Sequence, residues 1–199
     1  MSDQTIDSGK RTWIIASGCA GVVGAGFAAV PFVSSFEPSE RARAAGAPVE
    51  VDISGLKAEQ QLTVEWRGQP VWIVRRTPEQ VAELPKLDPL LADPKSQRNP
   101  DELTPPYARN EHRSIKPEIL VVVGICTHLG CSPTDKFTPG AQPSLPADWP
   151  GGFLCPCHGS TFDMAARVYK NKPAPDNLRV PPHMYVADNK IIIGEEKKA

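Results

Sequence analysis

The chain has 199 residues, which is enough for one modest domain with appendages. Its 22 basic residues nearly balance its 23 acidic residues, and this balance excludes the electrostatic footprint of a protein that binds nucleic acid. Its 22 prolines are more than twice the usual share of about 5%, which favours a loop-rich fold of short strands over a helical bundle.

Near the N-terminus, an uncharged stretch has the length of a membrane span. As a helix, residues 13–32 (WIIASGCAGVVGAGFAAVPF) would cover roughly 30 Å, the thickness of the hydrocarbon core of a bilayer. Lys10 and Arg11 directly precede this stretch, and an excess of basic residues marks the cytoplasmic side. We therefore expect a cytoplasmic N-terminus (residues 1–12), a single transmembrane anchor (residues 13–33), and a periplasmic remainder on a bacterial inner membrane.

A cleaved signal peptide is the alternative to an anchor. Residues 42–44 and 45–47 resemble small-residue cleavage sites. However, the apolar region of a signal peptide usually runs about 7–15 residues and ends near its cleavage site, whereas here the charged stretch 37–43 intervenes. A retained anchor is therefore the favoured interpretation. The absence of a presequence rich in Arg and Ser indicates a bacterial rather than a mitochondrial protein.

Beyond the anchor, the pattern changes to a tether and then to short strands. Residues 34–48 are small, polar and charged, which predicts a flexible hinge with one or two helical turns. The elements expected after it are strands at 49–53, 62–66 and 71–75, a short helix at 78–91, an exposed Pro-rich excursion at 94–117, and buried strands at 119–124 and 191–194. These elements predict an all-β head over residues 49–199.

Two short motifs hold four of the five cysteines and two of the four histidines. The first motif is C-T-H-L-G-C at residues 126–131, and the second is C-P-C-H-G-S at residues 155–160. Each follows an apolar stretch, so each is predicted to be a loop at the end of a strand. A structural zinc site usually takes ligand pairs separated by two to four residues, whereas Cys126 and His128 are separated by one. A zinc-binding structural module stays an alternative, but a cluster with two iron atoms suits this spacing better.

Together the two motifs resemble the paired signature of Rieske iron–sulfur proteins, in which two histidines replace two cysteines on one iron. The additional cysteine in each motif resembles the branch of that family that oxidises quinols in cytochrome bc-type complexes. The sequence K-P-A-P at residues 172–175 resembles the proline loop that shields the cluster in this branch, and residues 45–51 are similar to the hinge of bacterial members. The resemblance thus covers nearly the whole chain.

The resemblance implies one 2Fe–2S cluster on an all-β Rieske-type head, with a cluster-binding part of short strands and loops at about residues 119–180. Four residues would ligate the two irons, one pair of cysteines on one iron and one pair of histidines on the other: Cys126, Cys155, His128 and His158. The resemblance also implies a disulfide between Cys131 and Cys157, a bond that suits an oxidising compartment.

The implied function is that of the iron–sulfur subunit of a ubiquinol–cytochrome c oxidoreductase in the respiratory chain. His158, with His128 beside it, would be catalytic, accepting the hydrogen bond and the proton of ubiquinol. Leu129 would lie over the cluster tip and face the quinol pocket of a cytochrome b partner, and Ser160 would donate its hydroxyl to a cluster sulfur. The electron would pass to a c-type cytochrome, contributing to proton translocation by a dimeric complex in the lipid bilayer.

Two positions depart from the resemblance. Phe162 stands where many relatives have a tyrosine, two residues after the serine of the second motif. Lys10 and Arg11 stand where two arginines are expected for twin-arginine export, which leaves the export route open. A rival function is the small Rieske subunit of a periplasmic oxidase of the arsenite oxidase type, which would be expected to lack the anchor.

Five aromatic or imidazole side chains outside the motifs receive a structural interpretation. His112 and His183 are expected to be ordinary surface or loop residues. Trp66, Trp72 and Trp149 are expected in the core.

Overall fold

The computed structural model describes residues 7–196, which form two compact units that meet in sequence between Ala44 and Ala45. The first unit contains α1 (Ser8–Ser34), a helix long and apolar enough to cross a membrane. The Asp7 carboxylate caps this helix by accepting from the N–H groups of Gly9 and Lys10 at 3.1 and 3.2 Å. The helix therefore includes the whole of the predicted span and begins five residues before it.

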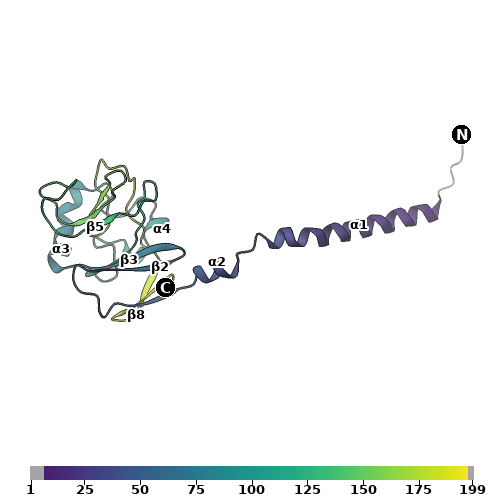
Figure 1. Cartoon of the computed structure of the whole chain (residues 1–199), viewed down its shortest axis with the longest axis horizontal. Helices are drawn as coiled ribbons and strands as arrows, with labels where there is room; N and C mark the ends of the chain where they lie inside the picture. Colours follow the sequence, from purple (N-terminus) through teal and green to yellow (C-terminus); the bar gives the residue numbers. More distant parts are fainter. Residues whose placement is uncertain (1–6, 197–199) are drawn as a thin grey trace. The chain divides into compact units, whose positions relative to one another are not determined.

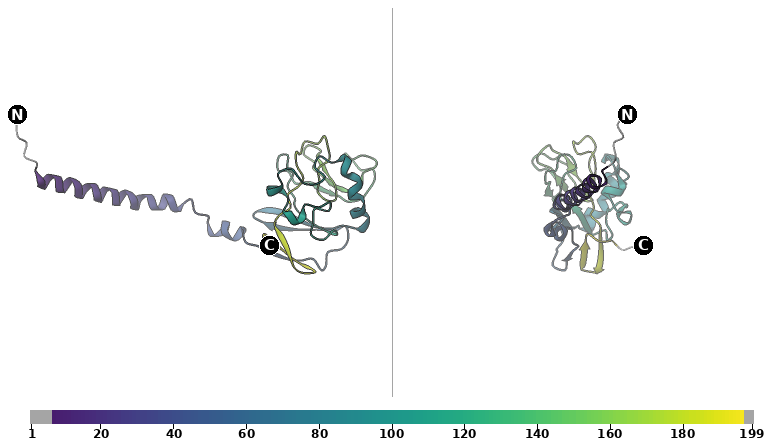
Figure 2. Two further views of the ribbon diagram at one scale, coloured as in Figure 1. Left: turned by 180° about the vertical axis from the view of Figure 1, so that it is seen from behind. Right: turned by 90° about the vertical axis from the view of Figure 1, so that its right-hand side faces the viewer.

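Short strands build the second unit, which confirms the predicted all-β head. They form three antiparallel three-stranded sheets, with strand orders β1-β9-β8, β2-β3-β4 and β5-β6-β7. Their bounds are β1 Val49–Asp52, β2 Gln61–Trp66, β3 Gln69–Arg75, β4 Ile119–Val123, β5 Thr134–Lys136, β6 Gly152–Leu154, β7 Thr161–Phe162, β8 His183–Ala187 and β9 Lys190–Ile193. Figure 2 shows these sheets from two further directions, with the β8–β9 hairpin in yellow.

The sheet β2-β3-β4 forms because its strands β3 and β4 are rich in apolar and β-branched residues. All five residues of β4 are buried, as are the four central residues of β3, so this pair lies in the interior of the head. Arg67 and Gly68 join β2 to β3 with φ of 52° and 69°, the left-handed values that a two-residue hairpin turn requires at both positions. The predicted strand order along the chain is thus correct in this region.

Short helices join the sheets, and here one prediction needs correction. The tether contains α2 (Glu40–Ala45), as expected. The helix predicted at 78–91 is α-helical only in α3 (Pro78–Glu83) and continues as the 3₁₀ helix η1 (Leu84–Leu90). The two prolines inside η1 have no N–H to donate to an α-helical ladder, which explains the change.

The excursion predicted at 94–117 contains α4 (Pro100–Leu103) and the 3₁₀ helix η2 (Pro106–Ala108), and much of it is exposed, as expected. Arg113 is an exception, because it turns inward and is fully buried. Its guanidinium donates to Thr104 Oγ1 at 2.9 Å and to three main-chain carbonyls, those of Ala165, Ala166 and Leu178. The hydrogen bonds of its two terminal nitrogens offset the cost of burying this guanidinium, whereas its Nε has no hydrogen-bond partner within residues 7–196.

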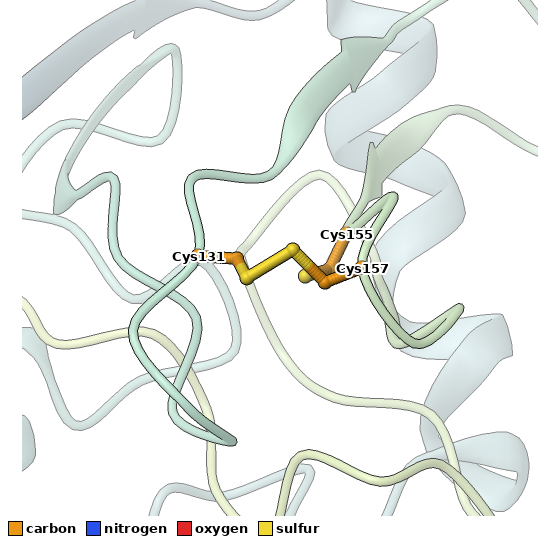
Figure 3. Close-up of side chains that lie close together, drawn as sticks. All are labelled: Cys131, Cys155 and Cys157. Carbon is orange, nitrogen blue, oxygen red and sulfur yellow. A yellow bond between two sulfur atoms is a disulfide. The ribbon is translucent and has the colours of Figure 1, made fainter.

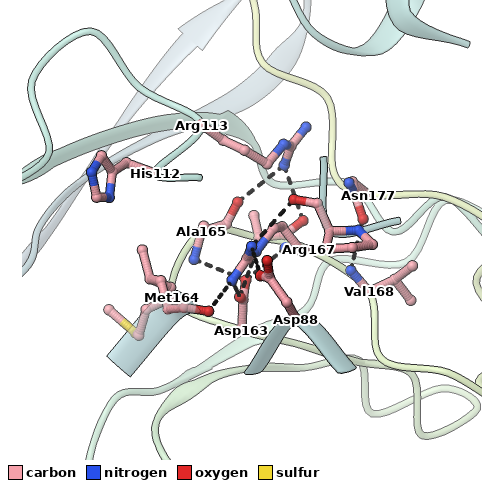
Figure 4. Close-up of polar contacts among 12 residues, drawn as sticks. Asp88, His112, Arg113, Asp163, Met164, Ala165, Arg167, Val168 and Asn177 are labelled. Carbon is pink, nitrogen blue, oxygen red and sulfur yellow. Dashed lines mark hydrogen bonds and ion pairs between the residues drawn. The ribbon is translucent and has the colours of Figure 1, made fainter. Parts of the chain in front are cut away.

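A second buried arginine fixes the chain immediately after β7 (Figure 4). Arg167 Nε donates to Asp163 Oδ2 at 2.8 Å, and its two terminal nitrogens reach Asp88 Oδ1 at 2.8 Å and the carbonyl of Leu84 at 2.7 Å. Asp163 is fully buried, and its Oδ1 accepts from the N–H groups of Ala165 and Arg167. The bonds from Arg167 to Asp88 and Leu84 hold η1 against the chain that leaves the second motif. The buried pair with Asp163 fixes the arginine itself, because breaking such a pair leaves an uncompensated charge.

The three tryptophans lie in the core as predicted, whereas the prediction for His183 is wrong. His183 lies in β8 and is only 1% exposed. Its Nδ1 lies 2.9 Å from the carbonyl of Pro181, and its backbone N–H donates to Tyr107 Oη at 2.7 Å. Burial lowers the pKa of His183 to about 4, so this imidazole is neutral in the folded head at neutral pH.

We expect the head to lose stability as pH falls from about 6.5 to about 4, because in this window unfolded His183 binds a proton that folded His183 does not. The loss from this residue is at most about 3 kcal/mol. His183→Asn keeps an N–H toward Pro181 and should flatten the profile, measured by urea unfolding at pH 7 and pH 4.5. His112→Asn is the matched control and should keep most of the slope. Equal slopes for wild type and His183→Asn would contradict the assignment.

Candidate metal centre

Both motifs form loops at one side of the sheet β5-β6-β7, and the two loops have the same pattern of backbone hydrogen bonds. The first loop precedes β5, and the second joins β6 to β7. In each loop, the N–H of the first cysteine donates to the carbonyl five residues later, and the N–H of a glycine donates back to that cysteine. These hydrogen bonds are Cys126 N to Cys131 O (2.8 Å), Gly130 N to Cys126 O (3.0 Å), Cys155 N to Ser160 O (2.7 Å) and Gly159 N to Cys155 O (3.0 Å).

The two glycines of this pattern are required by their conformation. Gly130 and Gly159 have φ of 81° and 74°, in the left-handed region that other residues rarely adopt. A Cβ at either position would meet no atom within 4 Å, so the constraint is the backbone angle rather than space. Each motif therefore needs glycine four residues after its first cysteine, and each has it.

A glycine before the first motif is required for space instead. Gly124 follows β4, and a Cβ there would come within 2.2 Å of the Trp72 indole, which stacks on Phe153 with ring centroids 5.4 Å apart. The core beneath the loops thus extends to Gly124, two residues before Cys126.

The four motif cysteines fall into two kinds. Cys131 and Cys157 form a disulfide that joins the two loops, with their Cα atoms 6.6 Å apart (Figure 3). Cys126 and Cys155 are free thiols and are each only 2% exposed. The sulfur atoms of Cys131, Cys155 and Cys157 lie within 4.8 Å of one another, but two of them are joined in the disulfide. The sulfurs left for a metal are therefore those of Cys126 and Cys155.

The two free thiols are neighbours beneath the surface. Burial raises the pKa of the Cys126 thiol, and the adjacent Cys155 raises it further, whereas hydrogen bonds from the His128 backbone N–H and the Ser160 hydroxyl lower it. A bound metal cation reverses this balance, because a coordinating thiol is deprotonated outright. The pair is thus arranged for a cationic ligand that takes both sulfurs.

The two motif histidines lie next to each other at the surface. His128 is partly buried and His158 is exposed, and their ring centroids are 4.7 Å apart at an interplanar angle of 88°. The structure therefore brings together two thiols and two imidazoles, with one of each from either loop. This donor set fits a 2Fe–2S cluster with one thiolate-bound and one imidazole-bound iron.

Ser160 and Leu129 occupy opposite environments beside these ligands. Ser160 is fully buried, and its Oγ accepts from the Ala174 N–H at 2.9 Å, which leaves its own proton free for another acceptor. Leu129 follows His128 and is 71% exposed, a large apolar side chain held out into solvent. Ser160 is thus buried with a proton to donate, and Leu129 is an apolar side chain on the surface.

A third loop, residues 172–176, lies against both motif loops. Besides the Ala174 bond to Ser160, the Thr127 hydroxyl donates to the carbonyl of Asp176 at 2.6 Å. The roles of Thr127 and Ala174 were not predicted from the sequence. The K-P-A-P motif marks the loop, but a main-chain donor at Ala174 has no signature in the side-chain pattern.

Comparisons with known proteins identify two family models and several relatives. A family model described as the Rieske [2Fe-2S] domain matches residues 105–182, and one described as the ubiquinol-cytochrome c reductase Fe-S subunit TAT signal matches residues 13–39. The ubiquinol-cytochrome c reductase iron-sulfur subunit of Allochromatium vinosum is 55% identical over 99% of this chain and 94% of its own length. The subunit of the same name from Bradyrhizobium diazoefficiens is 40% identical over 90% of each chain. A solved chain of a hyperthermophilic respiratory Complex III is 26% identical, covers 89% of this chain and 97% of its own, and has a TM-score of 0.47.

Proposed function

This chain belongs to the family of ubiquinol–cytochrome c reductase iron-sulfur subunits and carries a Rieske-type 2Fe–2S cluster, and from this premise we propose which of its residues bind the cluster and which react with ubiquinol. It is one subunit of an oxidoreductase complex. Four residues ligate the cluster, two from each motif loop: Cys126, His128, Cys155 and His158. The observation that carries this assignment is the meeting of two buried thiols with two adjacent imidazoles.

When bound, the cluster supplies a one-electron acceptor, whose histidine-ligated iron has the higher potential because imidazole is neutral where thiolate is anionic. Cys126 and Cys155 hold it from the buried side and keep water from its sulfurs. The Cys131–Cys157 disulfide holds the two loops at the separation that the ligands need.

The exposed imidazole of His158 is the group that meets ubiquinol. With the cluster held by these ligands, a ring nitrogen of His158 would accept a hydrogen bond from a quinol hydroxyl and then take its proton, with His128 beside it as the second such group. Leu129, exposed next to His128, supplies the apolar contact that seats this tip in the quinol pocket of a cytochrome b partner. The electron then passes to a c-type cytochrome.

The chain is membrane-anchored through α1. We place its N-terminus in the cytoplasm of a bacterium and its head in the periplasm, within a dimeric complex in the inner membrane. Lys10 and Arg11 before the helix support this orientation, and a disulfide between the motif loops suits an oxidising compartment. The TAT-signal match over residues 13–39 supports twin-arginine export despite the lysine at position 10.

The direct test uses the complex purified from membranes. Ubiquinol should reduce the cluster, read as the appearance of its EPR signal, and oxidised cytochrome c should abolish that signal. The rival oxidase subunit of the arsenite oxidase type predicts no reduction by quinol. A cluster that dithionite reduces but ubiquinol does not would therefore contradict the proposed function.

Phe162 gives a prediction about the potential. Phe162 lies two residues after Ser160 and its ring is fully buried, so we expect a tyrosine hydroxyl at this position to reach a cluster sulfur. A hydrogen bond to a charged acceptor is worth about 1.5–3 kcal/mol, and roughly 1–1.5 kcal/mol of it should favour the reduced form. Phe162→Tyr should therefore raise the midpoint in a redox titration by about 40–60 mV.

The matched control is Phe153→Tyr, because Phe153 is the β6 residue paired with Phe162 and is also fully buried. Its ring packs on Trp72 and Phe137, so an added hydroxyl should lower stability without raising the potential. If Phe162→Tyr behaves like this control, the ring of Phe162 points away from the cluster.

A further inference from the structure

The third loop owes its position to three hydrogen bonds of its backbone. Pro173 and Pro175 have no N–H, so the donor between them is the N–H of Ala174, which is bonded to Ser160 Oγ at 2.9 Å. The carbonyl of Pro175 accepts from an Arg98 guanidinium nitrogen at 2.9 Å, and that of Asp176 accepts from Thr127 at 2.6 Å. Arg98 is therefore the contact that comes from outside the site.

Asn177 anchors the C-terminal end of the same loop (Figure 4). It is 2% exposed, and its Oδ1 accepts from the Val168 N–H at 2.9 Å. Its Nδ2 donates to the carbonyl of Asp93 at 2.9 Å and to Ser96 Oγ at 3.2 Å. A buried amide with both ends bonded in this way fixes the chain segments it joins.

Arg98 and the two residues that accept from Asn177 belong to one short segment, residues 93–98, which we call the clamp. The buried Asp93 carboxylate accepts from the backbone N–H of Gln97 at 2.9 Å and from that of Arg98 at 3.0 Å. These bonds fix the backbone from which the Arg98 side chain reaches Pro175. The clamp thus bonds to the third loop at Pro175 and to Asn177, the residue that directly follows the loop.

This arrangement bears on the direction of one hydroxyl proton. Ser160 has one proton and two lone pairs, and the Ala174 N–H occupies a lone pair, so the proton turns toward another acceptor. Ser160 is fully buried and closes the second motif loop, where its carbonyl accepts from the Cys155 N–H at 2.7 Å, so the acceptor offered to its proton is a sulfur of this site. A hydrogen bond to a ligand sulfur favours the reduced, more negative state of a cluster and raises its potential.

We propose that Arg98 and Asn177 are positioning residues for the redox centre: by holding the third loop, they keep the Ala174 N–H on Ser160 and so keep the Ser160 proton on the ligand sulfur. The proposal rests on the proposed function, since it needs a cluster at this site. It assigns control of the potential to an exposed arginine and a buried asparagine that lie outside the two motifs.

The test is a double-mutant cycle read by EPR redox titration of the full chain in its complex. Arg98→Ala should weaken reduction of the cluster about three- to fivefold, which is about 30–40 mV. Lys95→Ala is the control, because it removes the same charge from the clamp, and within residues 7–196 Lys95 forms no hydrogen bond or ion pair. In a Ser160→Ala background, the effect of Arg98→Ala should vanish.

Two results would overturn the proposal. One is an equal shift of the potential in Arg98→Ala and Lys95→Ala, which would show that the loss of a positive charge alone causes the shift. The other is a shift from Arg98→Ala that persists without the Ser160 hydroxyl. A wild-type chain with no cluster signal would instead refute the proposed function, so the two failures are distinguishable.

Hydrogen exchange of the peptide that contains Ala174 gives a second readout, which needs no turnover. Asn177→Asp keeps the acceptor for Val168 and removes the donors to the clamp, so it should be milder than truncation. Exchange at the Ala174 amide should be faster in Asn177→Asp and Arg98→Ala than in Lys95→Ala. Unchanged exchange in both variants would overturn the proposal.

Discussion

Cys155→Ser is expected to yield a chain without its cluster, whereas Cys19→Ser is expected to retain it fully. Cys155 is a buried free thiol beside Cys126, and Cys19 is an exposed thiol on α1. Thiolate ligands hold the iron of a Rieske centre, and a serine hydroxyl is a far poorer ligand for it. The measurement is iron per chain together with the EPR signal of the reduced protein.

The imidazole ligands allow the same comparison. His158→Asn should also abolish the signal, whereas His112→Asn and His183→Asn should leave it intact, because neither residue lies in the motif loops. Full iron content in Cys155→Ser or His158→Asn would show that the ligand set is wrong. Loss of iron in His112→Asn would show that iron content follows folding rather than ligation.

The second large effect is expected when the disulfide is removed. Cys131 and Cys157 are 26 residues apart in sequence, and closing a loop of that length is worth about 3.5 kcal/mol in the chain-entropy account. The variant with both cysteines replaced by serine should unfold, and should lose the visible absorption of its cluster, at a lower denaturant concentration than the wild type. Its potential should also fall, because the two loops no longer hold their positions around the ligands.

The control for the disulfide is again Cys19→Ser, which removes a thiol without removing a cross-link. Mass spectrometry of the native protein gives an independent answer. Two alkylatable thiols at Cys131 and Cys157 would contradict the pairing, whatever the stability of the serine variant.

The fold could be predicted where a local pattern carries it. β3 and β4 are runs of β-branched residues, and the hairpin turn at Arg67 and Gly68 sits where the pattern breaks. The apolar stretch identified α1, but not its start at Ser8, because the cap on Asp7 extends the helix into polar residues. A hydrophobic run indicates the thickness of a membrane rather than the limits of a helix.

The errors arise where distant segments supply the partners. Arg113 and His183 are polar residues in Pro-rich sequence, and polarity alone predicts exposure. Arg113 is buried because carbonyls after β7 accept from it. His183 is buried where the distant Tyr107 hydroxyl accepts from its backbone N–H, with the carbonyl of the nearby Pro181 beside its ring. No local pattern contains that information.

The residues of the site also divide into those that a local sequence pattern predicts and those that only the folded chain reveals. The two motifs name the ligand types at fixed spacing, and the structure places their side chains together, so chemistry and position agree. The other contributors, Thr127 inside the first motif and Ala174 and Arg98 outside both motifs, act through single hydrogen bonds between loops. Such contacts depend on how three loops meet, and only the folded chain shows that.

The most direct test of the account is the metal content of the full chain purified from membranes. We predict two irons and two labile sulfides per chain, with the low-g EPR signal on reduction that is typical of mixed histidine and cysteine ligation. Stoichiometric zinc without iron, in a chain with no visible absorption, would contradict it.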